Sequence, residues 1–307
     1  MLKRTIYTYI IILCLFLSTN RLFAKGGSPR FNRNTHHYFY TNITPAYSII
    51  FDNFENTEAK GGFGSIVGLG YSFVVPNFWF EVGAEMQMLS SYMTITDEFS
   101  DKRIIDTEGD EVTYHYNKEL WYDRQDLCYI GVPVMFGYHH DNGFAMGVGF
   151  KYSLNVLGLE HNRLRYSISA TYSDYIEDFE DMPNHYYGDY ESYVRGNITN
   201  RVNRAKAAVC LEAGYVVYNN HKNYVRSRKR HVLLRVSSYF ECGVSQLMLR
   251  NSEPQGMYRL HTSNPAKLIN TPYYLSDNSS TMRTLPFMVG IRLTYTLATI
   301  TCRTCKR

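Results

Sequence analysis

The chain has 307 residues, of which 20% are charged and 15% aromatic, and its most unusual feature is a content of 28 tyrosines. If residues 1–24 are removed as a leader, Lys3, Arg4 and Arg21 go with them, leaving 29 basic against 28 acidic residues. This balance gives no electrostatic reason to expect nucleic-acid binding. The length allows one or two domains, and the lack of a linker or internal repeat favours one.

The first 24 residues are predicted to form a secretory signal peptide. Lys3 and Arg4 provide the basic start, residues 6–17 the apolar core, and Ala24 the small residue at the cleavage site. The apolar run is too short for a transmembrane helix, and no later stretch approaches about 18 apolar residues. Residues 25–307 are therefore expected to form one domain, with a short periplasmic tail at 299–307.

Alternating apolar residues predict eight β-strands along the chain. They are 38–51, 62–75, 78–97, the two halves of a hairpin over 126–157, then 206–218, 231–249 and 285–298. The hairpin is the clearest of these. Val132, Val134 and Phe136 share one face of its first half, and Val148 and Phe150 share one face of its second half. Each half is long enough to cross a bilayer at a tilt, which takes roughly 9–11 residues.

The opposite face of the hairpin carries mainly Gly, Ala and Ser, with an occasional charge such as Lys151. Small residues suit the cramped interior of a barrel of about eight strands. The apolar face then points outwards, which lipid tolerates and water does not. A soluble lipocalin-like binder or a β-sandwich is the alternative, and it predicts the reverse facing, with Phe150, Val289 and Ile291 inside.

The connections between the predicted strands alternate in length. Pro76-Asn77 and 140–142 are short turns, whereas 98–125, 158–205 and 250–284 are long and polar. Short periplasmic turns and long external loops are typical of outer-membrane barrels. The expected fold is all-β, an eight-stranded antiparallel up-and-down transmembrane barrel. The basic segment 219–230 departs from this pattern as a long turn, interpreted as solvated, with contact to inner-leaflet phosphates as the alternative.

Charged residues on the inward face are expected to pair with one another, because an unpaired charge in a low-dielectric interior costs several kcal/mol. We interpret this set as a structural network that fills the lumen, with ion or proton conduction as the alternative. Its members are Glu81, Glu85, Lys151, Glu212, Arg235, Glu241 and Arg292.

No motif predicts catalysis, a metal or a cofactor. A hydrolase would need a nucleophile beside a base, for which His161 or His115 with Ser167 or Ser169 are the available residues, but no G-x-S-x-G elbow is present. The pairs at 36–37 and 139–140 are adjacent histidines, which point to opposite faces of a strand and chelate poorly. The Cys302/Cys305 pair lacks the βαβ context of a redox site.

The segment 174–191 carries seven acids and four tyrosines, and it is the most distinctive of the long connections. We interpret it as a solvated external loop, with partner recognition as the alternative, because tyrosines supply rigid contact area. The residues that would serve recognition are Asp174, Tyr175, Glu177, Asp178, Tyr186, Tyr187, Asp189 and Tyr190.

The run 129–138 (YIGVPVMFGY) resembles the Y-x-x-x-P strand of PorT-like and OmpA-like outer-membrane β-barrel domains. The glycine-rich runs GLGYSF at 68–73 and GVGFKYS at 147–153 are similar to their strands. The resemblance implies an eight-stranded barrel without a catalytic site, and for some PorT-like proteins a part in secretion. The long connection after Leu157 and the basic turn depart from the simplest members.

These observations predict an integral protein of the cell outer membrane with a structural or interaction role carried by its external loops. Its expected partners are outer-membrane lipids, lipopolysaccharide, and envelope or secretion proteins, but not nucleic acid. It is expected to be neither a wide-pore porin nor an enzyme, and to hold no cofactor. The alternatives are a lipid-modifying enzyme of the outer membrane and the soluble binder described above.

Overall fold

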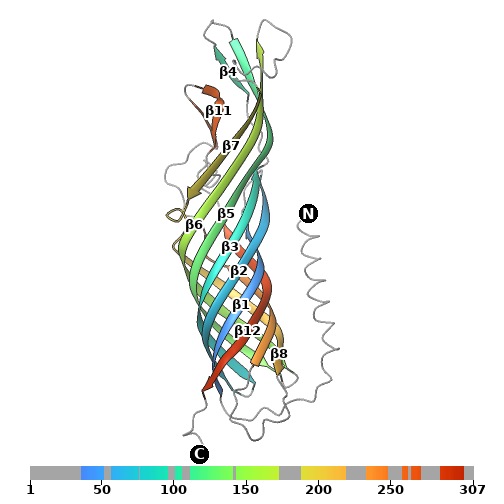
Figure 1. The fold of residues 1–307 in the computed structure, drawn as a ribbon, viewed down its shortest axis with the longest axis vertical. Helices are drawn as coiled ribbons and strands as arrows, with labels where there is room; N and C mark the ends of the chain where they lie inside the picture. Colours follow the sequence, from blue (N-terminus) through green and yellow to red (C-terminus); the bar gives the residue numbers. More distant parts are fainter. Residues whose placement is uncertain are drawn as a thin grey trace, which may run out of the picture.

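The computed structural model describes residues 36–51, 57–75, 77–95, 101–105, 111–140, 143–172, 188–218, 233–247, 258–261, 264–270 and 284–300. Eight strands form a closed antiparallel barrel (Figure 1). They are β1 (His36–Phe51), β2 (Thr57–Val74), β3 (Phe78–Ile95), β5 (Glu111–His139), β6 (Phe144–Tyr172), β8 (Ala205–Tyr218), β9 (Leu233–Gly243) and β12 (Leu285–Ile300).

The ring closes because β1 pairs with β2 on one side and with β12 on the other. The remaining neighbours are β2 with β3, β3 with β5, β5 with β6, β6 with β8, β8 with β9, and β9 with β12, all antiparallel. Closure leaves no unpaired strand edge in the barrel. Two turns at one end, between β2 and β3 and between β5 and β6, are tight: Val75 and Phe78 exchange backbone hydrogen bonds of 2.8 and 3.3 Å, and Gly143 has φ 92°.

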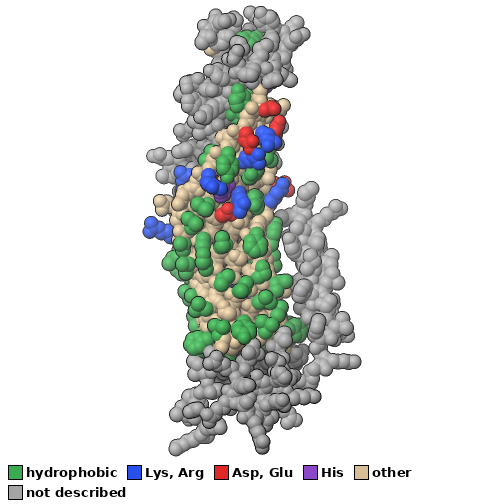
Figure 2. Space-filling view, viewed as in Figure 1, with side chains coloured by type: hydrophobic (Ala, Val, Ile, Leu, Met, Phe, Trp, Pro, Cys, Tyr) green, Lys and Arg blue, Asp and Glu red, His purple; other side chains and the backbone are tan. Residues whose placement is uncertain are grey.

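Apolar side chains point away from the barrel axis, as the alternation predicts. Phe150 is 68% exposed, Leu69 66% and Ile291 45%. This facing contradicts the soluble-binder alternative, which required Phe150 and Ile291 inside. On the described stretches of the eight strands, no charged residue faces outward between the tight-turn end and the level of Leu157. Figure 2 shows this apolar belt as the green lower half of the described surface.

The interior is filled by side chains. Trp121, Arg292, Tyr129, Tyr239, Lys151 and Lys206 are the largest of those that are almost completely buried. Glycines make room for them at close approaches. A Cβ on Gly137 would lie 2.0 Å from the Trp79 ring, and one on Gly70 would lie 2.6 Å from the Tyr40 hydroxyl.

The hairpin of β5 and β6 extends well beyond the rest of the barrel (Figure 1). β4 (Lys102–Ile105) pairs with the outer part of β5, and β7 (Gly188–Asn197) pairs with the outer part of β6. A further small hairpin consists of β10 (Tyr258–His261) and β11 (Asn264–Asn270). We call the part formed by 111–127, 158–172, β4 and β7 the extension.

The extension corrects the sequence interpretation of two connections. Residues 111–125 and 158–172, expected to be loops, are strand. Part of the reason is a pair of bulges: the register shifts between Lys118 and Leu120 and between Cys128 and Tyr129. Each inserts one residue and re-phases the alternation. The seventh strand is also shorter than expected, ending at Gly243 rather than 249.

Several predictions fall outside the described residues. They are the signal peptide 1–24, the basic segment 219–230 and the Cys302/Cys305 pair. Among the residues that are described, no helix has the length and hydropathy needed to cross a membrane.

Candidate functional site

The lumen holds an unbroken chain of alternating acids and bases. Its order is Glu81, Arg235, Glu212, Arg292, Glu85, Lys151, Glu241 and Lys206. The seven residues that the sequence analysis named all lie in this chain, and each is at most 7% exposed. Four carboxylates therefore face four cations, so this chain of ion pairs is formally neutral.

The two arginines bridge carboxylates from different strands. Arg235 on β9 donates two hydrogen bonds to Glu81 on β3, of 3.0 and 2.7 Å, and its Nε lies 2.8 Å from Glu212 on β8. Arg292 on β12 donates to Glu85 at 2.9 Å and lies 3.7 Å from Glu212. The bidentate Arg235–Glu81 pair has fixed geometry, and the arginine contacts together connect four strands across the lumen.

The two lysines continue the chain toward the extension. Lys151 on β6 lies 3.3 Å from Glu85 and also pairs with Glu241. Lys206 donates to Glu241 at 2.6 Å and to the Gln87 side chain at 2.9 Å. Buried charges need such multiple partners, because two charges withdrawn from water must recover their hydration energy.

Aromatic rings line the cations of the chain. Arg292 lies 3.8 Å from the centroid of Tyr239, Arg235 lies 4.4 Å from that of Trp79, and Lys206 lies 5.0 Å from that of Tyr129. A cation over an aromatic face gains a further attraction, larger when desolvated. The rings also occupy the volume between the ion pairs, which leaves the chain surrounded by side chains rather than water.

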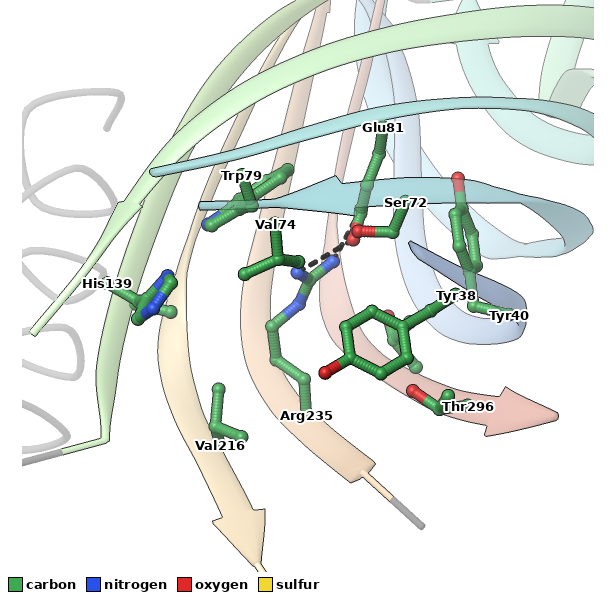
Figure 3. Close-up of a pocket in the computed structure, with 12 residues that line it drawn as sticks. Tyr38, Tyr40, Ser72, Val74, Trp79, Glu81, His139, Val216, Arg235 and Thr296 are labelled. Carbon is green, nitrogen blue, oxygen red and sulfur yellow. Dashed lines mark hydrogen bonds and ion pairs between the residues drawn. The ribbon is translucent and has the colours of Figure 1, made fainter. Parts of the chain in front are cut away.

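A pocket lies at the tight-turn end of the lumen, where the chain begins (Figure 3). Trp79, Glu81 and Arg235 form its inner side, and the figure shows the Arg235 guanidinium bonded to Glu81. Tyr38, Tyr40, His139 and Thr296 also contribute to its lining. The pocket therefore stops at the first ion pair of the chain.

Lys206 is the one member of the chain that the sequence analysis did not name. It is the second residue of β8, and the predicted strand began at the same residue. The alternation on β8 could have identified it. Every second residue from Lys206 to Glu212 lies on the same face of the strand, and Lys206, Ala208, Cys210 and Glu212 are all buried. The inward set named from the sequence had four acids and three bases, which left one carboxylate in need of a further cation.

The outer face of the extension carries a second group of charges. Arg124 on β5 pairs in register with His161 on β6, which pairs with Arg195 on β7. One row further out, Tyr122 pairs with Arg163, and Arg163 with Tyr193. Figure 2 shows this band of charge directly beyond the apolar belt. We call Arg124, His161, Arg163, Arg165 and Arg195 the arginine band.

The residues considered for catalysis lie on this outer face in two places. His161 Nε2 lies 3.7 Å from Asp126, and its Nδ1 contacts the Tyr193 hydroxyl at 3.0 Å. His115 pairs in register with Ser169 but contacts Thr171 Oγ1 through Nε2 at 2.9 Å, while its Nδ1 lies 3.0 Å from Asp101. Ser167 pairs with Asn117, not with a histidine.

The other sequence candidates are dispersed. Asp189 and Tyr190 lie on β7, where the Tyr190 ring stacks on Tyr166 at 5.7 Å, but residues 174–187 of the proposed recognition loop lie outside the described residues. The His37 ring contacts the Tyr71 hydroxyl, and His139 is buried while His140 is exposed. In the described part of the chain, no three His, Cys, Asp or Glu side chains gather as a metal site.

No protein-family model and no curated protein matches the chain. Solved structures that it resembles include Neisserial surface protein A, with a TM-score of 0.32 and 8% identity over 84% of this chain and 97% of that one. Another is the attachment invasion locus protein Ail of Yersinia pestis, in complex with the heparin analogue sucrose octasulfate. It has a TM-score of 0.28 and 11% identity over 84% of this chain and 98% of that one. A third is the outer membrane protease OmpT of Escherichia coli, with a TM-score of 0.25 and 9% identity over 88% of this chain and 99% of that one. Because these TM-scores are low, we infer the barrel from the ring of strand pairings in this structure alone.

Proposed function

We propose that this chain is an integral outer-membrane protein with a closed lumen, which acts through its extension rather than as a pore or an enzyme. The observation that carries the proposal is the inversion of polarity across the barrel wall. Charged residues are packed inside and an uncharged apolar belt faces out, which is the arrangement required by lipid and unfavourable in water.

The closed lumen supports a role other than transport. An eight-stranded barrel has an interior that side chains can fill, and here the chain of ion pairs and its aromatic rings fill it. A conducting path would have to separate these pairs, each of which gives up its hydration on burial. We therefore infer that the barrel anchors and positions the extension.

The extension supplies the surface for interaction. Its exposed tyrosines, arginines and carboxylates stand beyond the belt, and scaffold-held segments of this kind commonly carry binding residues. A part in protein secretion, which the resemblance to PorT-like domains implies, would use this same surface. Binding of an envelope protein that is lost when 111–127 and 158–172 are shortened in register would support it.

Fractionation of expressing cells tests the membrane setting. We expect the protein in the outer-membrane fraction, resistant to urea extraction, and migrating faster on an unheated gel than on a heated one. Recovery in the soluble periplasm, or extraction by urea, would overturn the proposal. In planar bilayers the purified protein should show no steady conductance, and a stable open channel would contradict the closed lumen.

One observation favours an enzyme as the second candidate function. Asp101, His115 and Thr171 have the order of an acid, an imidazole and a hydroxyl, with both contacts near 3 Å. The side chains of Asp101 and His115 are 58% and 37% exposed, so water competes with the preorganised electrostatics that catalysis needs. A change in membrane lipids that depends on the gene and is abolished by Thr171→Val would establish this alternative.

A further inference from the structure

The arginine band lies at a defined height on the molecule. On β3 and β6 the outward residues up to Met88 and Leu157 belong to the apolar belt, and both pair in register with Cys128 of β5. The row of Arg124, His161 and Arg195 begins only a few residues beyond them. In the membrane setting proposed above, this is the level of the headgroups of the outer leaflet, on which this inference rests.

The band has more cationic capacity than its own carboxylates use. Asp126 accepts from Arg124 Nε at 3.0 Å, and Glu191 pairs with Arg163. Arg165 lies 3.9 Å from both Glu191 and Glu119. Arg195 contacts the His161 ring through Nε at 3.1 Å. Among the described residues, no carboxylate pairs with Arg195.

The contacts of Arg124 and Arg195 have a feature in common. Both use Nε, and within the described part of the chain their terminal Nη groups have no hydrogen-bond partner. Such groups present a planar fork of N–H donors that matches the oxygens of a phosphate. The two arginines stand two strands apart, with only the His161 ring between them.

His161 keeps this gap free of a third positive charge. Partial burial lowers the pKa of the His161 imidazole, and the adjacent Arg195 and Arg124 lower it further, whereas Asp126 acts in the opposite direction. The ring is therefore neutral at pH 7 and accepts the hydrogen bond from Arg195. It acts as a spacer that fixes one arginine while Asp126 fixes the other.

Aromatic side chains lie within the row and in the row just beyond it. The Tyr92 ring lies 5.3 Å from the Arg124 guanidinium carbon, and the Tyr193 ring lies 6.4 Å from the His161 ring. Tyrosine is favoured at the membrane–water interface because its ring is apolar and its hydroxyl is polar. This combination suits a ligand that has both an acyl chain and a charged headgroup.

We propose that Arg124 and Arg195, with Arg163 beside them, form a binding site for the phosphate of an outer-leaflet glycolipid, of the kind carried by lipid A. The acyl chains of the lipid would lie against the apolar belt below, and its phosphate would accept hydrogen bonds from the two guanidinium forks. A basic residue near a membrane surface contributes roughly a five-fold gain in affinity for an anionic lipid.

The test uses the full-length protein in dodecyl maltoside micelles, with diphosphoryl lipid A and its dephosphorylated form as probes. We expect the wild-type protein to bind the phosphorylated lipid preferentially. The double variant Arg124→Ala with Arg195→Ala should bind it roughly 25-fold more weakly, at the level of the dephosphorylated lipid. Arg103→Ala on β4, which removes an exposed arginine outside the band, is the matched control and should bind as the wild-type protein does.

A second double variant, Arg124→Lys with Arg195→Lys, keeps the charge but removes the forks. It should bind more weakly than the wild-type protein, and equal binding would reduce the site to diffuse surface charge and overturn the proposal. Displacement of the lipid by millimolar inorganic phosphate would also overturn it, by assigning the site to soluble anions. Heat-dependent gel mobility confirms that each variant is folded, so loss of lipid preference is distinguishable from failure of membrane insertion.

Discussion

The lumen chain and the arginine band contain the same kinds of residue in opposite surroundings. In the lumen, each arginine contacts two carboxylates and an aromatic ring and is buried; Arg292 is 2% exposed. In the band, side chains such as Arg124 and Arg165 are 41% and 44% exposed and share carboxylates. An ion pair therefore fixes structure only where water cannot replace its partners. The band is therefore available for a ligand and the lumen is not.

The largest expected effect comes from breaking the lumen chain. Arg292→Ala leaves Glu85 and Glu212 buried with one cation fewer, and we expect it to lower the free energy of unfolding by about 3–5 kcal/mol. Urea unfolding in lipid vesicles, followed by the fluorescence of Trp79 and Trp121, measures this change. Arg163→Ala in the band is the matched control and should leave the unfolding midpoint unchanged. Equal effects of the two substitutions would contradict the distinction between a structural lumen chain and a replaceable band.

The next effect concerns the belt. Val148 is 49% exposed on the outward face of β6, where lipid tails are expected. Val148→Arg should destabilise the folded barrel by about 2–4 kcal/mol, the cost of an arginine near the bilayer midplane. The matched control is Ile105→Arg on β4, which is 75% exposed and lies in the extension. Vesicle-reconstituted unfolding of both variants measures the difference, and a stable Val148 variant would place that face in water.

A smaller effect is expected inside the band. Arg124→Ala removes the hydrogen bond to Asp126 but leaves solvent to replace it, so the free energy of unfolding should fall by at most about 1 kcal/mol. The same measurement in high salt should reduce the difference further, because salt screens exposed charges. A larger loss that persists in salt would show that the band is structural.

The smallest effect is a pH dependence at His161. Its pKa is lowered in the folded protein, chiefly by burial, so its contribution to stability is present above the ordinary value of 6.5 and is lost as the pH falls below it. Protonation would place a third positive charge between Arg124 and Arg195, with Asp126 as the nearest opposing charge. Because intrinsic amide exchange slows as the pH falls, hydrogen exchange of the β7 amides should slow less between pH 7 and pH 5 than the intrinsic rates predict, which gives an excess of exchange at pH 5. In His161→Gln the excess should disappear, and its persistence would assign it to another group.

Much of the barrel was predictable because alternation is a local property. Residues such as Val132, Val148 and Leu293 recur with a period of two. The uncharged outward face of a strand can therefore be read from that strand alone, without knowing which strand it pairs with. The extension was missed for a different reason on each strand. On β6, Val156 is the inserted residue at a bulge, and it moves the following residues to the opposite face. On β5, the alternation continues outward to Trp121, but inward residues such as Asp123 and Gln125 are polar and give no apolar pattern.

The lumen charges were predictable as a set but not as pairs. The alternation along each strand assigned Glu85 and Lys151 to the interior. Which cation pairs with which carboxylate depends on the stagger of the strands around the ring. The arginine band was not predictable for a related reason. Arg124, His161 and Arg195 are far apart in the sequence, and they meet only because β7 pairs with the outer part of β6.

The most direct measurement of the central claim, an apolar face in lipid around a sealed polar lumen, is thiol labelling in intact membranes. Val148→Cys and Ser153→Cys lie on opposite faces of β6, at 49% and 1% exposure, and Ile105→Cys provides a water-exposed reference. Labelling is read as the increase over the protein without these substitutions. We expect Val148→Cys to react only with a lipid-soluble reagent, Ser153→Cys with neither reagent, and Ile105→Cys with a water-soluble one. Water-soluble labelling of Val148→Cys as fast as that of Ile105→Cys would contradict the account.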